Sequence, residues 1–185
     1  MTTDDHLMIQ FQQGSQEAFT ELFERYRDVV YGFFRRRLDH PARAEELTQD
    51  CFLALLKNVQ RYEPRATFRS YLFGIASNMV SAERRSSAQE SARSQPLNES
   101  FPRTSVRPRS GADDAALWVQ TALEKLEKSE REIVMLREYE QLSYAEIAAL
   151  LRLPINTVRS RLFRARMALK DQLMPAKEQL DRGIQ

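Results

Sequence analysis

The chain has 185 residues, enough for one ordinary domain or two small ones, and its 28 basic and 26 acidic side chains leave a net charge of only +2. So small a net charge excludes a protein that is drawn to nucleic acid as a whole, and phosphate contacts must come from local basic patches. A single cysteine, Cys51, excludes an intrachain disulfide and a thiolate metal cluster, and no apolar run approaches the ~20 residues that span a bilayer, so we expect a cytoplasmic protein that is not an integral membrane protein.

A long helix is predicted after a short acidic lead, because Gly14 and Ser15 mark a break and apolar residues then recur at intervals of three and four. This core stripe consists of Phe19, Leu22, Phe23, Tyr26, Val30 and Phe33. The helix ends in Arg35, Arg36 and Arg37, whose charges complement the negative end of the helix dipole. A contact of these arginines with nucleic acid is the alternative interpretation.

A second helix is predicted over residues 42–60, with Leu47, Cys51, Leu55 and Val59 on its inner side. Its outer side carries an acidic patch made up of Glu45, Glu46, Gln49 and Asp50. Such a patch either keeps a domain soluble or docks a basic partner surface, and the pattern leaves both interpretations open.

Pro64 places residues 62–67 in a loop, and Thr67 is a candidate cap of the next helix, which is predicted over 68–85. The inner face of that helix comprises Phe68, Leu72, Ile75, Ala76, Met79 and Val80. Tyr62, Tyr71 and Phe73 flank a loop and helix rich in Arg, Ser and Asn, a mixture that stacks on and hydrogen-bonds unpaired bases. Because aromatics at helical spacing are more often core residues, the pattern alone favours the core over strand binding.

The composition changes at Ser86, after which Ser, Pro, Arg and Gln dominate and large apolar residues are rare. Such a segment cannot bury enough apolar surface to offset the entropy lost on ordering it. We therefore predict an all-α protein of two small helical domains, 1–87 and 115–175, joined by a flexible linker over 88–114 and followed by a tail over 176–185 that frays.

The second domain is predicted to begin with two short helices. The first, over 115–126, offers Leu117, Trp118, Ala122 and Leu126 for packing. Ser129 and Glu132 have the spacing of a capping box at the start of the second helix. Further core residues are Ile133, Val134, Leu136 and Tyr139.

The sequence SYAEIAALLRLPINTVRSRLFRARMALK, residues 143–170, predicts two more helices joined by a tight turn. Ser143 and Glu146 form a capping box, so the first of these helices begins next to Ser143. It must end before Pro154, because the residue that precedes a proline is pushed out of the α region. Two short helices at this separation are typical of a helix-turn-helix, whose second helix enters the major groove of DNA.

The second of these helices, over 155–169, has distinct inner and outer faces. The inner residues are Ile155, Val158, Leu162, Ala165 and Leu169. The outer face and its flanks have no acidic residue and consist of Asn156, Thr157, Arg159, Ser160, Arg161, Phe163, Arg164, Arg166 and Met167. Arginines suit contacts with phosphate or guanine, and an outward Phe163 needs a partner surface, which favours DNA binding over a merely solvated basic helix.

In this order, the two halves resemble the small two-domain bacterial RNA polymerase sigma factors of the extracytoplasmic-function group, in the sigma-70 family, over about residues 11–173. The motif EREIVMLREYEQLSYAEIAALLRLPINTVRSRLFRARMALK resembles region 4, which reads the minus-35 promoter element. The motifs ARAEELTQDCFLALLKNVQRY and TFRSYLFGIASN resemble region 2, which docks on the polymerase and opens the minus-10 element. The resemblance implies a factor for promoter recognition, DNA opening and transcription initiation. Its expected partners are RNA polymerase core, promoter DNA and, as is common in the group, an anti-sigma factor.

The resemblance also implies roles for residues at matching positions. Polymerase binding falls on Glu46, Leu47, Gln49 and Asp50. Capture of an unpaired minus-10 base falls on Tyr62, Arg65, Thr67, Arg69, Tyr71, Phe73 and Asn78. Of the outward residues named above, Arg159, Ser160, Phe163 and Arg164 match the minus-35 helix, with Asn156, Thr157 and Arg161 beside them. Tyr71 stands where the family usually has Trp, and Asn156 stands where Gly is common.

We expect no enzyme activity, cofactor or metal, because the sequence offers no acid pair, nucleophile with a base, phosphate loop or metal-ligand set. A recombinase with a C-terminal helix-turn-helix is disfavoured, since no nucleophile in residues 1–87 has suitable neighbours. A stand-alone repressor or activator is the main alternative. It predicts stable promoter binding by the free protein, whereas a sigma factor requires polymerase core.

Overall fold

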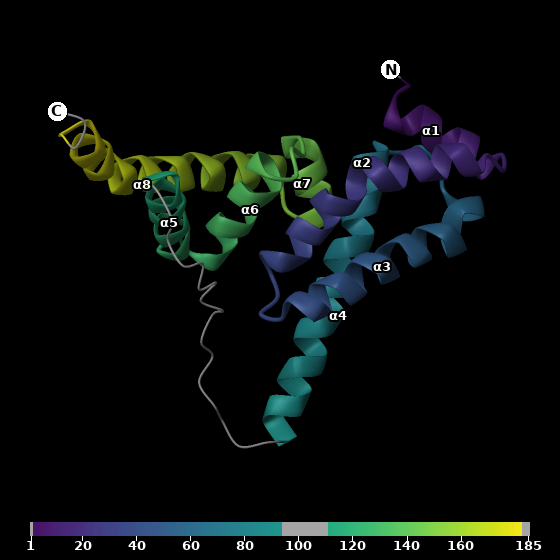
Figure 1. Ribbon diagram of the computed structural model, residues 1–185, viewed down its shortest axis with the longest axis horizontal. Helices are drawn as coiled ribbons and strands as arrows, with labels where there is room; N and C mark the ends of the chain where they lie inside the picture. The colour runs from purple at the N-terminus through teal and green to yellow at the C-terminus, as the bar shows by residue number, and fades with distance from the viewer. Residues whose placement is uncertain (1, 94–110, 183–185) are drawn as a thin grey trace. The chain divides into compact units, whose positions relative to one another are not determined.

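The computed structural model describes residues 2–93 and 111–182, and every regular element within these ranges is a helix. This confirms the all-α prediction. The chain divides into two compact units, Met1–Thr104 and Ser105–Gln185, each with its own helices and core (Figure 1).

The first unit begins with a helix that the sequence analysis missed. Its elements are α1 (Asp4–Gln12), α2 (Gln16–Arg35), α3 (Pro41–Asn58), the short 3-10 helix η1 (Val59–Arg61) and α4 (Phe68–Arg93). Only an acidic lead was expected where α1 lies. The helix forms because Thr3 caps it, Asp4 and Asp5 suit the positive end of the helix dipole, and Leu7 and Met8 are buried.

Helices α2, α3 and α4 build the core of the first unit. The predicted core residues that are buried are Leu22, Tyr26, Val30, Phe33, Leu47, Cys51, Leu55, Phe68, Leu72, Ala76 and Val80. Those that are only half-buried are Phe19, Phe23, Val59, Ile75 and Met79. Burial raises the pKa of the Cys51 thiol to about 12, so this cysteine stays protonated and packs as a small apolar side chain.

The arginines at the end of α2 lie against its backbone. Arg37 Nη1 donates to the Phe33 carbonyl at 3.1 Å, and the Arg37 guanidinium covers the Phe33 ring with its Cζ 3.7 Å from the centroid. Arg35 Nη1 donates to the Leu38 carbonyl at 3.2 Å. For Arg35 and Arg37 these contacts favour the interpretation as helix-end cations over a contact with nucleic acid.

The second unit contains α5 (Gly111–Glu124), α6 (Lys128–Glu138), α7 (Tyr144–Leu151) and α8 (Ile155–Arg182). Its buried apolar residues are Ala122, Leu126, Ile133, Val134, Met135, Leu136, Leu142, Ile147, Val158, Leu162 and Ala165. Three expectations were wrong. Leu117 and Tyr139 are exposed. Ser129 does not cap α6, because that helix begins after Glu127 and the Ser129 hydroxyl donates to the Glu127 carboxylate at 2.8 Å instead.

Several helices run further than the sequence predicts. Helix α4 continues to Arg93, since no Gly or Pro interrupts the chain between Gly74 and Pro96. Residues 88–93 and 111–114 of the expected linker are therefore helical, and its remainder, 94–110, lies outside the described residues. Helix α8 passes Pro175 and reaches Arg182, so most of the stretch expected to fray is helical, and residues 183–185 are not described.

Candidate functional site

The predicted helix-turn-helix is present in α7 and α8. Ser143 Oγ accepts from the Glu146 N–H at 3.2 Å, and the Glu146 carboxylate accepts from the Ser143 N–H at 2.7 Å, which is the expected capping box. After Leu151 the chain turns at Arg152, which adopts a left-handed conformation with φ 53°. The capping box fixes where α7 begins, and the turn at Arg152 fixes where it ends, just before α8.

Helix α8 exposes the face that residue spacing predicts. Val158, Leu162 and Ala165 are buried, and Phe163 is 67% exposed. The other outward residues are exposed or half-buried, namely Asn156, Thr157, Arg159, Ser160, Arg161 and Arg164. The buried stripe is shorter than predicted, because Ile155 at one end is exposed. An aromatic ring with arginines on either side of it therefore stands on the surface of α8.

Two arginines of α8 are held by carboxylates of α6. Arg164 Nε lies 3.0 Å from Glu130 Oε1, and Arg166 Nη2 lies 2.7 Å from Glu138 Oε1. Both guanidinium groups remain largely exposed, so each pair contributes only about 0–1 kcal/mol to stability. Exchange of either carboxylate for a DNA acceptor would therefore cost little. No sequence pattern predicts these pairs, because their partners are 34 and 28 residues apart along the chain.

The loop over residues 62–67 contains a buried tyrosine. Tyr62 is 3% exposed, and its ring meets that of Tyr71 edge to face, with centroids 5.0 Å apart. Burial raises the pKa of both phenols. Within the described part of the chain, no group hydrogen-bonds the buried Tyr62 hydroxyl. A hydroxyl in this state costs about 1–3 kcal/mol, which a bound molecule or water can recover.

The other residues predicted for strand capture fall into two groups. Arg65, Thr67 and Asn78 are exposed, Arg69 is half-buried, and Thr67 Oγ accepts from the Ser70 N–H at 3.2 Å as the predicted cap of α4. Phe73 is fully buried, with its ring centroid 5.3 Å from that of Phe33. In this conformation Phe73 has no surface to offer a base, which corrects its predicted place beside the loop.

The residues predicted to bind polymerase lie on α3, and all but one are exposed. Glu46, Gln49 and Asp50 are on the surface, whereas Leu47 is buried in the core and has no surface for a partner. The exposed face continues into Leu53, which is 48% exposed, and Leu56, which follow at helical spacing. Sequence analysis missed these two leucines as surface residues, because apolar side chains on a helix are usually assigned to the core.

Arg43 orders one edge of this α3 face. Its guanidinium donates to both oxygens of Glu83 on α4, at 2.8 and 2.7 Å, and to Glu46 at 2.7 Å. These hydrogen bonds hold the pKa of Glu83 below its ordinary value and raise that of Arg43. Arg43 thus links the Glu46 carboxylate of α3 to Glu83 of α4.

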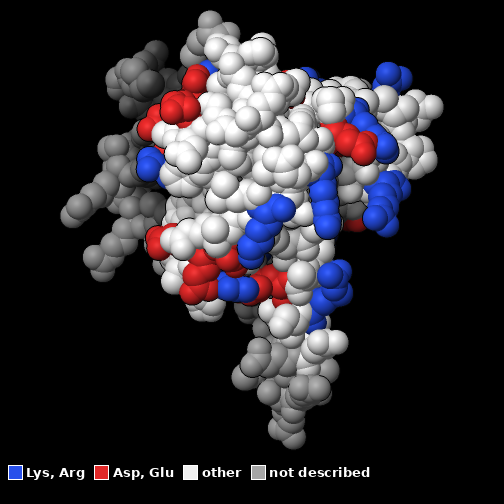
Figure 2. All heavy atoms as spheres, turned by 90° about the vertical axis from the view of Figure 1, so that its right-hand side faces the viewer, with Lys and Arg blue, Asp and Glu red and all other residues white. Residues whose placement is uncertain are grey.

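Acidic and basic side chains are interspersed on the face that Figure 2 presents. The structure pairs Arg25 with both Asp4 and Glu21, and it pairs Arg65 with Glu63. With a net charge of +2, attraction to DNA must come from local groups of arginines and not from the charge of the chain as a whole.

Family models match both units of the chain. The model described as Sigma-70 region 2 matches residues 22–90, and the model described as Sigma-70, region 4 matches residues 116–169. The first match contains α3 and the 62–67 loop, and the second contains the helix-turn-helix.

Two curated relatives and one solved structure agree with these matches. The RNA polymerase sigma factor CarQ of Myxococcus xanthus is 31% identical over 166 residues, which cover 90% of this chain and 95% of CarQ. The ECF RNA polymerase sigma factor SigE of Mycolicibacterium smegmatis is 33% identical over 87% of this chain, and the chain spans 63% of SigE. The sigma factor RpoE of Bartonella quintana, solved with the anti-sigma factor NepR, shares the fold with a TM-score of 0.66 at 22% identity, over 84% of this chain and 96% of that one.

The chain belongs to the sigma-70 family, and within it to the extracytoplasmic-function sigma factors of RNA polymerase. Sigma factors are non-catalytic transcription initiation factors that bind polymerase core and promoter DNA. No helix within residues 2–93 and 111–182 combines the length and hydropathy of a membrane span.

Proposed function

We propose that three surfaces of this chain divide the work of promoter recognition. The exposed face of α3 binds polymerase core, the 62–67 loop with the start of α4 captures an unpaired minus-10 base, and α8 reads the minus-35 duplex. The first two surfaces belong to a domain over 1–87 and the third to a domain over 115–175. The single observation that carries the proposal is the outward face of α8, where Phe163 is 67% exposed among arginines.

On α8, the arginines and Phe163 have complementary tasks. Arg159 and Arg164 can each donate two hydrogen bonds to a guanine or anchor a phosphate, and an exposed phenyl ring can contact a thymine methyl group. The turn after α7 supports this assignment, because Arg152 in a left-handed conformation ends α7 and the Pro154 carbonyl accepts from the Val158 N–H at the start of α8, the helix that would enter the groove.

At the loop, Tyr71 offers the more accessible ring and Tyr62 supports it edge-on. Stacking of a base on an aromatic ring contributes about 1–3 kcal/mol, which offsets much of the few kcal/mol that unstacking costs. Arg65 and Arg69 lie close in sequence to both tyrosines and suit the strand's phosphates. Phe73 contributes from the core, by supporting the helix that carries Tyr71.

Core-dependent transcription tests the proposal. The full chain with RNA polymerase core should give run-off transcripts from genomic DNA, and the mapped start sites then supply its promoters. Tyr71→Ala should reduce transcription from a duplex promoter more than from one that is premelted at the minus-10 element. Equal loss on both templates would argue against base capture.

The stand-alone regulator makes the opposite prediction for the free chain. It should bind promoter duplex stably without polymerase, whereas the sigma factor should bind weakly until core is added. A gel-shift titration with and without core separates the two. In the proposed role the chain performs no covalent chemistry itself and acts in the cytoplasm, where polymerase works. We further propose an anti-sigma factor as regulator, as in the RpoE–NepR complex.

A further inference from the structure

Helix α1 lies against the start of the 62–67 loop. At its C-terminal end, the Gln12 side-chain Nε2 donates to the Tyr62 carbonyl at 3.0 Å and to the Val59 carbonyl at 3.2 Å. In return, Gln60 Nε2 donates to the Gln12 carbonyl at 3.2 Å. One glutamine thus binds the 3-10 helix η1 and the first residue of the loop together.

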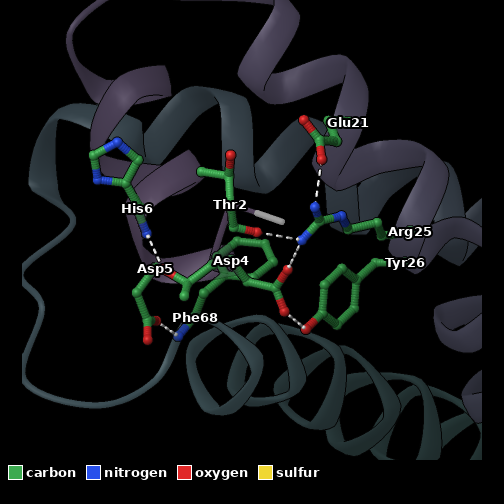
Figure 3. Close-up of polar contacts among 9 residues, drawn as sticks. Thr2, Asp4, Asp5, His6, Glu21, Arg25, Tyr26 and Phe68 are labelled. Atoms are coloured by element: carbon green, nitrogen blue, oxygen red, sulfur yellow. Dashed lines mark hydrogen bonds and ion pairs between the residues drawn. The ribbon is translucent and has the colours of Figure 1, made fainter.

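The other end of α1 binds the end of the same loop. The Asp5 carboxylate accepts from the backbone N–H of Phe68, the first residue of α4, at 2.5 Å (Figure 3). This N–H is one of the donors at the start of a helix that have no partner within the helix itself. The charge of Asp5 also adds to burial in raising the pKa of Tyr62, as expected if the carboxylate lies near that phenol.

Helix α1 is itself anchored to α2. Arg25 Nη1 donates to Asp4 at 2.6 Å and also to the Thr2 carbonyl at 3.0 Å, and the Tyr26 hydroxyl donates to Asp4 at 2.5 Å (Figure 3). Burial and this hydrogen bond raise the pKa of Tyr26 to about 12, so the hydroxyl remains a donor at neutral pH. Because α1 is bonded to α2 in this way, its two contacts with the loop are held in place relative to the core of the first unit.

We infer that α1 is a clasp which sets the separation and orientation of the two ends of the base-capture loop, with Gln12 and Asp5 as its positioning residues. Between Asp5 and Gln12 the helix advances about 10 Å, at about 1.5 Å per residue, and this rigid length spans the loop from Tyr62 to Phe68. The inference rests on the proposed capture of a base by this loop. A loop held at both ends in advance does not lose that ordering entropy again when a strand binds.

The test compares isosteric variants within the full chain bound to polymerase core. Gln12→Glu keeps the size of the side chain but removes the donor and sets a carboxylate against two carbonyls. Gln13→Glu adds the same charge at the exposed next residue and serves as the matched control. Asp5→Ala removes the acceptor for Phe68, and Asp5→Asn restores an oxygen there.

The probe is a fluorescent single strand that carries the non-template minus-10 sequence of a promoter mapped with the wild-type polymerase complex. Gln12→Glu and Asp5→Ala should weaken its binding about tenfold, whereas Gln13→Glu and Asp5→Asn should stay near the wild type. Affinity for core should be unchanged in all four variants. Thermal unfolding of each variant shows how much protein is folded at the assay temperature.

The inference is overturned if strand binding falls only in proportion to the folded fraction, or if it is unchanged in both Gln12→Glu and Asp5→Ala. Should Gln12→Glu fail to fold, the Asp5→Ala and Asp5→Asn pair still decides the result. Tyr71→Ala separates the two levels of the proposal. If Tyr71→Ala weakens strand binding and the α1 variants do not, only the clasp is rejected; if Tyr71→Ala also has no effect, base capture and the clasp are rejected together.

Discussion

Replacement of Arg164 by alanine tests how α8 reads DNA. The Arg164 side chain is exposed and directly follows Phe163 in the chain. Within the described residues, its ion pair is with Glu130. If it contacts DNA as proposed, it can exchange this carboxylate for a base edge or a phosphate. We expect Arg164→Ala to weaken recognition of the minus-35 element selectively, at one base pair.

The expected magnitude follows from two opposing contributions. A bidentate contact of arginine with guanine contributes about 1–3 kcal/mol of discrimination. Giving up the exposed pair with Glu130 costs the wild-type protein about 0–1 kcal/mol, and this cost is absent in the alanine variant. The net loss is then between about 0 and 3 kcal/mol, and the midpoints of the two ranges give about 1.5 kcal/mol, or roughly tenfold in affinity. The alanine variant is best made in a Glu130→Gln background as well, because an unpaired carboxylate beside the groove would itself repel DNA.

The assay is binding of the polymerase complex to a panel of promoters with single substitutions across the minus-35 element, at several salt concentrations. A base contact predicts that the variant loses its preference at one position only. A phosphate contact predicts uniform weakening and a salt slope smaller by about one unit. Arg166→Ala, whose partner is Glu138, is the matched control. Unchanged selectivity together with unchanged affinity would refute any role for Arg164 in DNA binding.

Three further predictions concern the remaining surfaces and the core. Asp50→Ala should weaken binding to polymerase core without lowering the unfolding temperature, since the side chain is exposed; normal co-purification with core would remove Asp50 from the docking face. Glu83 has a lowered pKa in the folded state, so its pair with Arg43 stabilises the fold above the unfolded-state pKa, and this stabilisation is lost as the pH falls through the folded-state value. Glu83→Gln should therefore lower the free energy of unfolding by at most about 1 kcal/mol at pH 7, because Arg43 is 40% exposed. In acid, where Glu83 is protonated, the substitution should have no effect. Urea titrations that show an equal loss at both pH values would contradict this. Leu162→Ala should lower the free energy of unfolding, measured by urea titration, by about 2–5 kcal/mol, because Leu162 is buried. Met167→Ala should change it by less than about 0.5 kcal/mol, because Met167 is exposed. Similar values for both would contradict the burial of the inner face of α8.

The helix-turn-helix was predictable because its signals are local. A capping box acts within four residues, a proline restricts its immediate neighbour, and Val158, Leu162 and Ala165 repeat with the period of one helix. None of these signals depends on what packs against the helix. The identity of the outward face followed from the same period, while its contact with DNA stays a prediction.

The features that sequence analysis missed depend on distant parts of the chain. Helix α1 is short, and its apolar residues from Leu7 to Ile9 are consecutive instead of following helical spacing. Its anchors are Arg25, Tyr26 and Phe68, which only the fold brings near. Phe73 was left out of the predicted inner face of its helix, but α4 contacts both α2 and α3, so its buried arc is wider than a single stripe. Leu53 and Leu56 were assigned to neither face of their helix, since nothing in a periodic pattern says which apolar residues stay uncovered.

The carboxylates of α6 give a physical reason why this chain should depend on polymerase. Arg164 lies on the side of α8 that we propose to contact DNA, and it is already paired with Glu130 of its own unit. Arg166, outside the proposed contact set, is paired with Glu138 in the same way. Salt-dependent affinity for duplex DNA grows with the number of phosphates that a protein neutralises, and a chain with a net charge of +2 adds little at longer range. Duplex binding by α8 alone is then weak and selective rather than strong and general.

A second anchor on polymerase core, through the exposed face of α3, would raise the local concentration of α8 at the promoter without strengthening its contacts. Free chain that bound promoter duplex as tightly as the polymerase complex does would contradict this account and favour the stand-alone regulator.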